Sequence, residues 1–269
     1  MNGVVFALGA VVGAILALTG AGGGILAVPL LVFALHLTVS EAAPVGLIAV
    51  GSASAFAAVL GLRQGVVRYR AALVMGVVGM VLAPLGVRLA RILPNAPLLI
   101  LFAFALAWVA WRTFRQAAFD STPAASVSPR PCLTDPAHGR LRWTRPCALV
   151  MATAGVVSGV LSGLLGVGGG FVIVPILSRF TDLPLRSVMA SSLAVIALVS
   201  VGAVAGAAHQ GAIDWAVAVP FAAGAIGALL VGRTVAAKLA PRMIQRSFAV
   251  VSAVVAALML ARGAGWISL

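Results

Sequence analysis

Charged side chains are scarce in this chain of 269 residues, and acidic ones are the scarcest. Only 9% of the residues are charged and five are Asp or Glu, whereas 62% are hydrophobic and the mean hydropathy is +1.18. This composition excludes an ordinary soluble domain. Several apolar stretches approach the roughly 20 residues that cross a bilayer as a helix. The alternating polarity of a membrane β-barrel is absent. We therefore predict an all-α polytopic membrane protein.

The residues that carry most enzyme chemistry are also few. Two cysteines, Cys132 and Cys147, flank a polar linker, and the three histidines show no paired spacing. This pattern offers no nucleophile–base pair, no cysteine pair within the membrane and no zinc-ligand spacing. We therefore expect no catalytic residue, no metal and no cofactor. If the linker is cytoplasmic, both cysteines should stay reduced.

Positive charge is the one charge in excess, at a net +13. In a soluble protein this excess would indicate nucleic acid as a partner. Here the arginines cluster between apolar stretches, which is typical of cytoplasmic loops under the positive-inside rule. We therefore expect a lipid bilayer and no nucleic acid as partner, with association into a homo-oligomer left open.

A glycine cluster interrupts the first apolar run and occurs again 146 residues later. Gly22-Gly23-Gly24 followed by Pro29 corresponds to Gly168-Gly169-Gly170 followed by Pro175. Gly20 falls on Gly166, and Gln64-Gly65 falls on Gln210-Gly211, without a gap. We predict two membrane repeats, 1–114 and 147–269, joined by a linker at 115–146.

Each repeat is expected to hold about five membrane segments. In the first repeat these are 3–19, 25–37, 42–62, 71–90 and 98–114. The second segment is too short for an upright crossing. Each Gly-interrupted first pair is therefore broken or re-entrant, giving eight full spans plus these helices, or else ten segments. The spacing of Gly9 with Gly13, and of Gly155 with Gly159, predicts close approach of membrane helices.

The distribution of Lys and Arg predicts how the repeats are oriented. If each Gly-interrupted pair enters and returns, the repeats are inverted, and fifteen basic residues lie inside against three outside, namely Arg88, Arg91 and Arg262. Parallel repeats would give ten against eight. The positive-inside rule favours inverted repeats. We expect the cell (inner) membrane, a cytoplasmic linker and both termini outside.

The doubled Gly-Gly-Gly-x4-Pro motif, with a Gln-Gly turn after the third segment, resembles the sulfite exporter TauE/SafE family, also called the 4-toluene sulfonate uptake family. The similarity covers nearly the whole chain outside the linker. It implies a secondary transporter, and specifically an exporter, of small sulfur-containing oxyanions such as sulfite or organosulfonates. The alternatives are a transporter or channel for another small anion and, as a different class, an intramembrane redox or enzymatic protein.

The glycine breaks are the predicted binding site for a small anionic substrate. A helix that starts at such a break presents free N–H groups and the positive end of its dipole. The competing interpretation is that the glycines only permit tight packing, and that nearby hydroxyls bond to their own helices. The candidate substrate-binding residues are Thr19, Gly22, Gly23, Gly24, Gly168, Gly169, Gly170, Ser191 and Ser192.

A second set of residues is predicted to act in structure or gating: Pro29, Pro175, Gln64, Gln210, Arg63 and His209. The prolines suit the first turns of short helices, or leave a carbonyl free if those helices start one turn earlier. The glutamines are gating groups or, preferably, turn residues. Arg63 and His209 occupy equivalent positions, as surface loop residues or at opposite mouths of a path.

The five acids are expected in loops or at helix ends: Glu41, Asp120, Asp135, Asp182 and Asp214. Carriers coupled to protons or sodium commonly use carboxylates within the membrane. Their expected absence there is consistent with anion efflux driven by the membrane potential, with His36, His209 or backbone carbonyls as the alternative groups for coupling a cation.

Overall fold

The computed structural model describes residues 2–118, 132, 144–236 and 241–264. The first half holds α1 (Asn2–Thr19), the 3-10 helix η1 (Gly20–Leu26), α2 (Ala27–Ala34), α3 (Val39–Arg63), α4 (Tyr69–Ile92) and α5 (Asn95–Ala118). The second half holds α6 (Arg145–Leu165), α7 (Gly170–Phe180), α8 (Leu185–His209), α9 (Trp215–Ala236) and α10 (Pro241–Gly263). The only β pairing among the described residues is an isolated bridge between Cys132 and Thr181.

Eight of these helices are long and apolar enough to cross a membrane. The other two, α2 with 8 residues and α7 with 11, are roughly 12 and 17 Å long, well short of a hydrocarbon core of about 30 Å. The outer faces of the long helices are apolar, with Val81 67% and Phe104 63% exposed, which suits contact with lipid chains. These features confirm the predicted all-α polytopic membrane fold, with eight full spans plus short helices.

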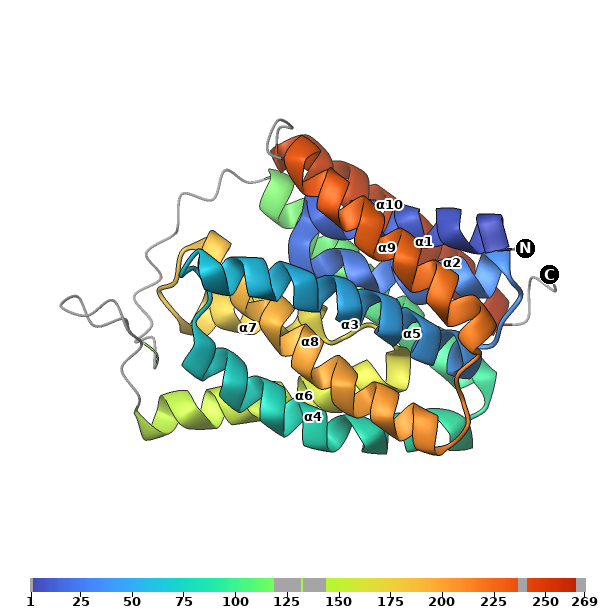
Figure 1. Cartoon of the computed structure of the whole chain (residues 1–269), viewed down its shortest axis with the longest axis horizontal. Helices are drawn as coiled ribbons and strands as arrows, with labels where there is room; N and C mark the ends of the chain where they lie inside the picture. The colour runs from blue at the N-terminus through green and yellow to red at the C-terminus, as the bar shows by residue number, and fades with distance from the viewer. Residues whose placement is uncertain (1, 119–131, 133–143, 237–240, 265–269) are drawn as a thin grey trace.

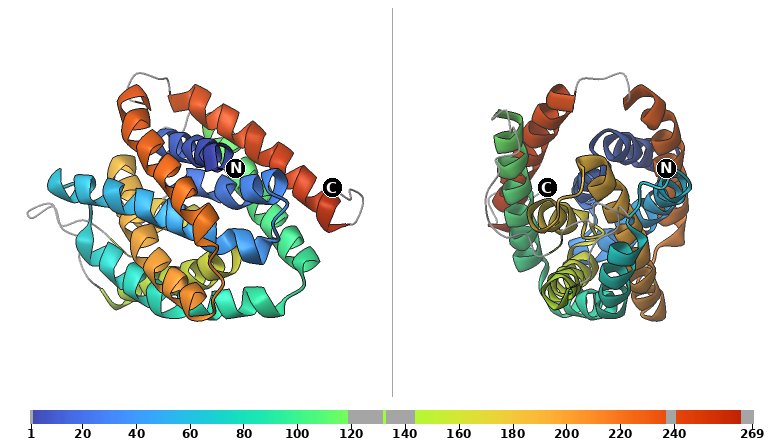
Figure 2. Two further views of the ribbon diagram at one scale, coloured as in Figure 1. Left: turned by 45° about the vertical axis from the view of Figure 1, so that its right-hand side comes forward. Right: turned by 90° about the vertical axis from the view of Figure 1, so that its left-hand side faces the viewer.

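Helices of one half pack mainly on helices of the other half. Gly9 and Gly13 on α1 lie against the backbone of α9 at Phe221 and Ala225. In the same way, Gly155 and Gly159 on α6 lie against α4 at Met75 and Gly79. A third pair, α5 and α10, forms one flank of the molecule (Figure 2). The predicted close approach at these glycines is confirmed.

The two ends of the molecule differ in which chain segments they hold. Figure 1 shows α1 beginning and α10 ending at the right, whereas α5 ends and α6 begins at the left. We call these the termini end and the linker end. The turns between α3 and α4 and between α7 and α8 also lie at the linker end, where α9 ends and α10 begins.

Polar side chains fix several helix boundaries at the termini end. Thr38 and Glu41 form a capping box at the start of α3, as Oγ1 of Thr38 accepts from the Glu41 N–H and the Glu41 carboxylate accepts from the Thr38 N–H. Arg262 Nη1 donates to the carbonyl of Val32 near the end of α2, where free carbonyls and the negative dipole end favour a cation.

Both glycine breaks begin on a left-handed residue, but they continue differently. Gly20 has φ +71° and Gly166 has φ +74°. After Gly20 the chain winds as the 3-10 helix η1 directly into α2. After Gly166 it stays non-helical to Gly169, with Gly168 and Gly169 also left-handed, and α7 starts at Gly170.

The different helix starts correct one of the proline predictions. Pro29 is the third residue of α2, so its missing N–H falls in the first turn, as predicted. Pro175 is the sixth residue of α7. The first-turn prediction is therefore wrong for Pro175, and the alternative applies, because a proline at this depth leaves a carbonyl of the preceding turn free.

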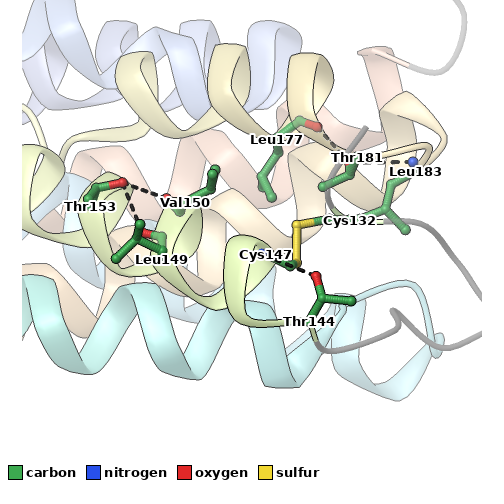
Figure 3. The surroundings of a disulfide bond; sticks show 9 residues. All are labelled: Cys132, Thr144, Cys147, Leu149, Val150, Thr153, Leu177, Thr181 and Leu183. Carbon is green, nitrogen blue, oxygen red and sulfur yellow. Dashed lines mark hydrogen bonds between the residues drawn. A yellow bond between two sulfur atoms is a disulfide. The ribbon is translucent and has the colours of Figure 1, made fainter. Parts of the chain in front are cut away.

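The cysteines are not free, contrary to the expectation of reduced thiols. Cys132 and Cys147 form a disulfide with Cα atoms 5.1 Å apart, and both side chains are buried (Figure 3). The Cys132 N–H donates to the carbonyl of Phe180 at the end of α7, so Cys132 is also held by backbone. The spacing of the two cysteines in the sequence did not predict the disulfide, because the contact that positions Cys132 is its hydrogen bond to the end of α7.

Candidate functional site

The two glycine breaks, far apart in sequence, lie against each other inside the molecule. A methyl group placed on Gly24 would lie 2.7 Å from Val50 Cγ1 and 3.3 Å from the carbonyl oxygen of Val167, in the second break. A methyl group on Gly168 would lie 2.7 Å from Ile196 Cγ2. The breaks therefore meet between α3, which carries Val50, and α8, which carries Ile196.

Most of the predicted glycines make tight packing contacts. Gly23, Gly24 and the segment 168–170 are buried. A side chain on Gly23 would collide with the backbone of Leu16 at 2.7 Å, and one on Gly169 would collide with Ser158. Gly22 differs, because it is partly exposed and a methyl there would meet only Phe248, at 3.9 Å. Gly22 is thus the glycine of the triplets at which a ligand has the most room.

The predicted hydroxyl ligands already have protein partners. Thr19 Oγ1 donates to the carbonyl of Ile15 at 2.7 Å, and Ser192 Oγ donates to that of Met189 at 2.8 Å, so both bond back to their own helices. Ser191 Oγ accepts from the Arg68 N–H at 2.9 Å and ties α8 to the start of α4. Ser54 and Ser200, at equivalent positions, are buried and their hydroxyls have no hydrogen-bond partner.

A cavity of about 190 Å³ opens at the linker end. We call it the linker-side cavity. Its inner wall is apolar and buried, with Leu16, Ala57 and Leu229, and it reaches Gly20, where the first glycine break begins. Gln64 and Arg186 are exposed at its mouth, where Arg186 Nη2 donates to Gln64 Oε1 at 3.1 Å. The cavity thus connects the basic end of the molecule with the break.

Sequence reasoning found Gln64 but missed Arg186. Gln64 caps the end of α3 before Gly65, whose φ is +67°, so its preferred turn role is observed together with the bond to Arg186. Arg63 and His209, predicted for opposite mouths, end α3 and α8 at opposite ends of the molecule but are not among the residues that line a described cavity. Arg186 lies in the first turn of a helix, and only its contact across to Gln64 marks it.

A second cavity, of about 10 Å³, lies at the termini end and is closed to anything larger than about one water molecule. We call it the termini-side cavity. The linker-side cavity, in contrast, has room for many water molecules. Arg91 lines the small cavity and donates from Nη1 to the backbone carbonyl of Gln210 at 2.9 Å. Gln210 caps the end of α8 before Gly211, whose φ is +61°. Gln64 caps the end of α3 in the same way.

None of the described acids lines either cavity. Glu41 caps α3, and the Asp214 carboxylate accepts from the Ala216 N–H at the start of α9. Asp182 lies between α7 and α8. The prediction of loop or helix-end positions is confirmed for these three, while Asp120 and Asp135 lie outside the described residues. The described part of the chain holds no group of three or more His, Cys, Asp or Glu that could bind a metal ion.

Comparison with known proteins gives the chain clear relatives. The family described as "Sulfite exporter TauE/SafE" matches residues 5–259. A "Probable membrane transporter protein" of Xylella fastidiosa (strain 9a5c) is 32% identical over 97% of this chain and 95% of its own length. A protein with the same description from strain Temecula1 / ATCC 700964 is 31% identical over the same shares. No solved structure matches the chain.

Proposed function

The chain belongs to the sulfite exporter TauE/SafE family and is a multi-pass membrane transporter, and from this premise we propose that it exports a small sulfur-containing oxyanion, such as sulfite or an organosulfonate, across the inner membrane. A transporter for another small anion is the runner-up, since the same positive cavity would accept it.

The observation that carries the proposal is the linker-side cavity. It leads from a mouth with the guanidinium of Arg186, along an apolar wall, to Gly20 in the first break. A cation at the mouth of a low-dielectric cleft concentrates anions there. Beyond Gly20, Gly22 leaves room for a ligand to approach the backbone. Backbone N–H groups at broken helices are a recurring anion site in transporters.

The packing of helices supports inverted repeats. Gly9 on α1 packs against Phe221 on α9. The equivalent residues, 146 positions away in the other half, are Gly155 on α6 and Met75 on α4, and these two also pack against each other. Each glycine contact between α1 and α9 thus has a counterpart between α6 and α4 in which the halves exchange roles. In Figure 1, α4 runs from left to right, whereas α9, its equivalent, runs from right to left. This supports repeats of opposite orientation, with the substrate path at their interface.

We place the linker end on the cytoplasmic side, because fifteen of the 18 Lys and Arg fall there under the inverted arrangement. A reducing compartment opens disulfides, whereas an oxidising one keeps them. This placement requires the Cys132–Cys147 disulfide of the structure to be open in the cell, so a maleimide should alkylate both cysteines in cells quenched without reductant. If the maleimide labels the cysteines only after a reductant has been added, the disulfide persists in the cell. This result would place the linker outside.

The proposed driving force is the membrane potential. An anion that leaves a cell with a negative interior gains about 2.3 kcal/mol per charge per 100 mV, so two charges gain about 4.6 kcal/mol. This corresponds to a gradient of more than a thousandfold. Glu41 and Asp214 cap helices at the termini end instead of lying midway along a span. Efflux should follow a potential set with potassium and valinomycin, and efflux that ignores this potential would refute electrogenic export.

The substrate proposal is tested by flux in proteoliposomes, with sulfite, thiosulfate, sulfate and a sulfonate compared side by side. Saturable flux of a sulfur oxyanion supports the proposal, whereas unsaturable flux indicates a channel. Gly22→Ala should lower the flux while leaving the folded protein intact, because the methyl group fits the structure but narrows the backbone approach. Gly227→Ala, where nothing lies within 4 Å, is the matched control. Equal flux in both variants would remove Gly22 from the path.

A further inference from the structure

The two cavities at opposite ends of the molecule are lined by equivalent residues. Met189, Leu193 and Val66 line the linker-side cavity, and the residues 146 positions away, Ala43, Leu47 and Ala212, line the termini-side cavity. They are therefore the same structural feature in the two halves, one open and one closed.

Contacts around the glycine breaks show what separates the open cavity from the closed one. At the open end, the atoms nearest to a methyl group on Gly20 belong to the flexible side chain of Met189, with its terminal methyl at 3.5 Å. At the closed end, the equivalent Gly166 lies directly against the backbone of Ala43 on α3. The start of α3 thus packs with its backbone against the second break, whereas the start of α8 lies next to Gly20 of the first break with a flexible side chain.

Each cavity carries one guanidinium that bonds to the repeated glutamine. At the linker end Arg186 donates to the side-chain oxygen of Gln64, and at the termini end Arg91 donates to the backbone carbonyl of Gln210. The sequence repeat does not account for this, since Arg186 is equivalent to Ser40 and Arg91 to Ala237. Two positions on different helices thus supply the same charge to equivalent mouths.

We propose that Arg186 with Gln64 is an anion-binding site at the linker-side mouth, and that Arg91 with Gln210 is its counterpart at the termini-side mouth. The glutamine holds the guanidinium at the rim, where its remaining N–H groups bind a small oxyanion through paired, charge-assisted hydrogen bonds. In this conformation the first site is accessible and the second is closed. This inference rests on the proposed function and assigns to it the residues that select for negative charge on each side.

The first test is flux measured separately from each side in oriented vesicles. Arg186→Gln should raise the half-saturation concentration for sulfite or thiosulfate about tenfold or more from the linker side, with less effect from the other side. Arg91→Gln should show the reverse. Arg186→Lys should restore part of the affinity. Arg70→Gln, which removes an exposed charge at the same end without lining the cavity, is the control. A change in Arg186→Gln no larger than in Arg70→Gln, or equal from both sides, would overturn the proposal.

The second test does not depend on transport. Ala190 lines the linker-side cavity, and Ala190→Cys in a Cys132→Ser, Cys147→Ser background places one thiol there. It should react faster with an anionic thiosulfonate reagent than with a cationic one, and Arg186→Gln should lower this ratio about tenfold. An unchanged ratio refutes the anion site. If this ratio changes but no sulfur oxyanion is transported, the proposed substrate fails and the anion site stands.

Discussion

The two glycine breaks share a sequence motif but differ in backbone conformation. The first has the sequence Gly20-Ala21-Gly22-Gly23-Gly24 and winds as a 3-10 helix, whereas the second, Gly166-Val167-Gly168-Gly169-Gly170, is an open turn with three left-handed glycines. Alanine favours helical winding and β-branched valine disfavours it, which agrees with this difference. The repeated motif therefore determines where the helices are interrupted in each half. The residues between the glycines determine the backbone conformation after the interruption.

The largest effect is expected where both breaks are tightest. Gly23→Leu and Gly169→Leu should abolish transport, because the side chain meets the Leu16 backbone in one case and Ser158 in the other. Insertion into the membrane should survive, since leucine favours insertion. Membrane content and flux are measured together, with Gly227→Leu as the control at an open position. Normal flux in both variants would show that the breaks do not need their close packing.

A sharper comparison uses the equivalent positions 22 and 168. Gly168→Ala should destabilise the protein by about 1–2 kcal/mol or more, because its φ of +77° disfavours any side chain and the methyl meets Ile196. Gly22→Ala should leave stability near that of the wild type, since only Phe248 is near, at 3.9 Å. Thermal unfolding in detergent measures both. Equal losses would mean that the two breaks are conformationally alike.

The two mouths can be compared through one equivalent pair. Val66 lines the open cavity and Ala212 the closed one, and both are partly exposed. In a background without native cysteines, Val66→Cys should react several-fold faster with a thiol reagent than Ala212→Cys, because its cavity admits the reagent. A saturating transported anion should reduce this difference if the closed end opens during transport. Equal rates without substrate would contradict the observed asymmetry.

The smallest effect is expected at Ser54 and Ser200. Their buried hydroxyls have no hydrogen-bond partner, so replacing either with alanine should change stability by no more than about 0.5 kcal/mol. Thermal unfolding is again the measurement. A clear loss of flux without a loss of stability would identify these hydroxyls as substrate ligands midway along α3 and α8.

The sequence predicted the fold well because the bilayer restricts it strongly. Apolar length located the spans, the glycine spacing located the close helix pairs, and Gly65 and Gly211 located the turns after Gln64 and Gln210. The site was harder, because it depends on contacts between distant segments. Arg186 becomes notable only when α8 begins beside the end of α3, and Cys132 only when it pairs beside α7. No periodicity in the chain encodes either contact.

The exchange of packing partners between the halves has a consequence for biogenesis. The partner of Gly9 on α1 is Phe221 on α9, which is synthesised 212 residues later. At 5–20 residues per second, α1 is in the membrane for roughly 10 to 40 s before its partner exists. During this time its small-residue face meets only lipid or the insertion machinery. The first half therefore cannot mature on its own, and assembly of the transporter is completed only when its last helices emerge from the ribosome.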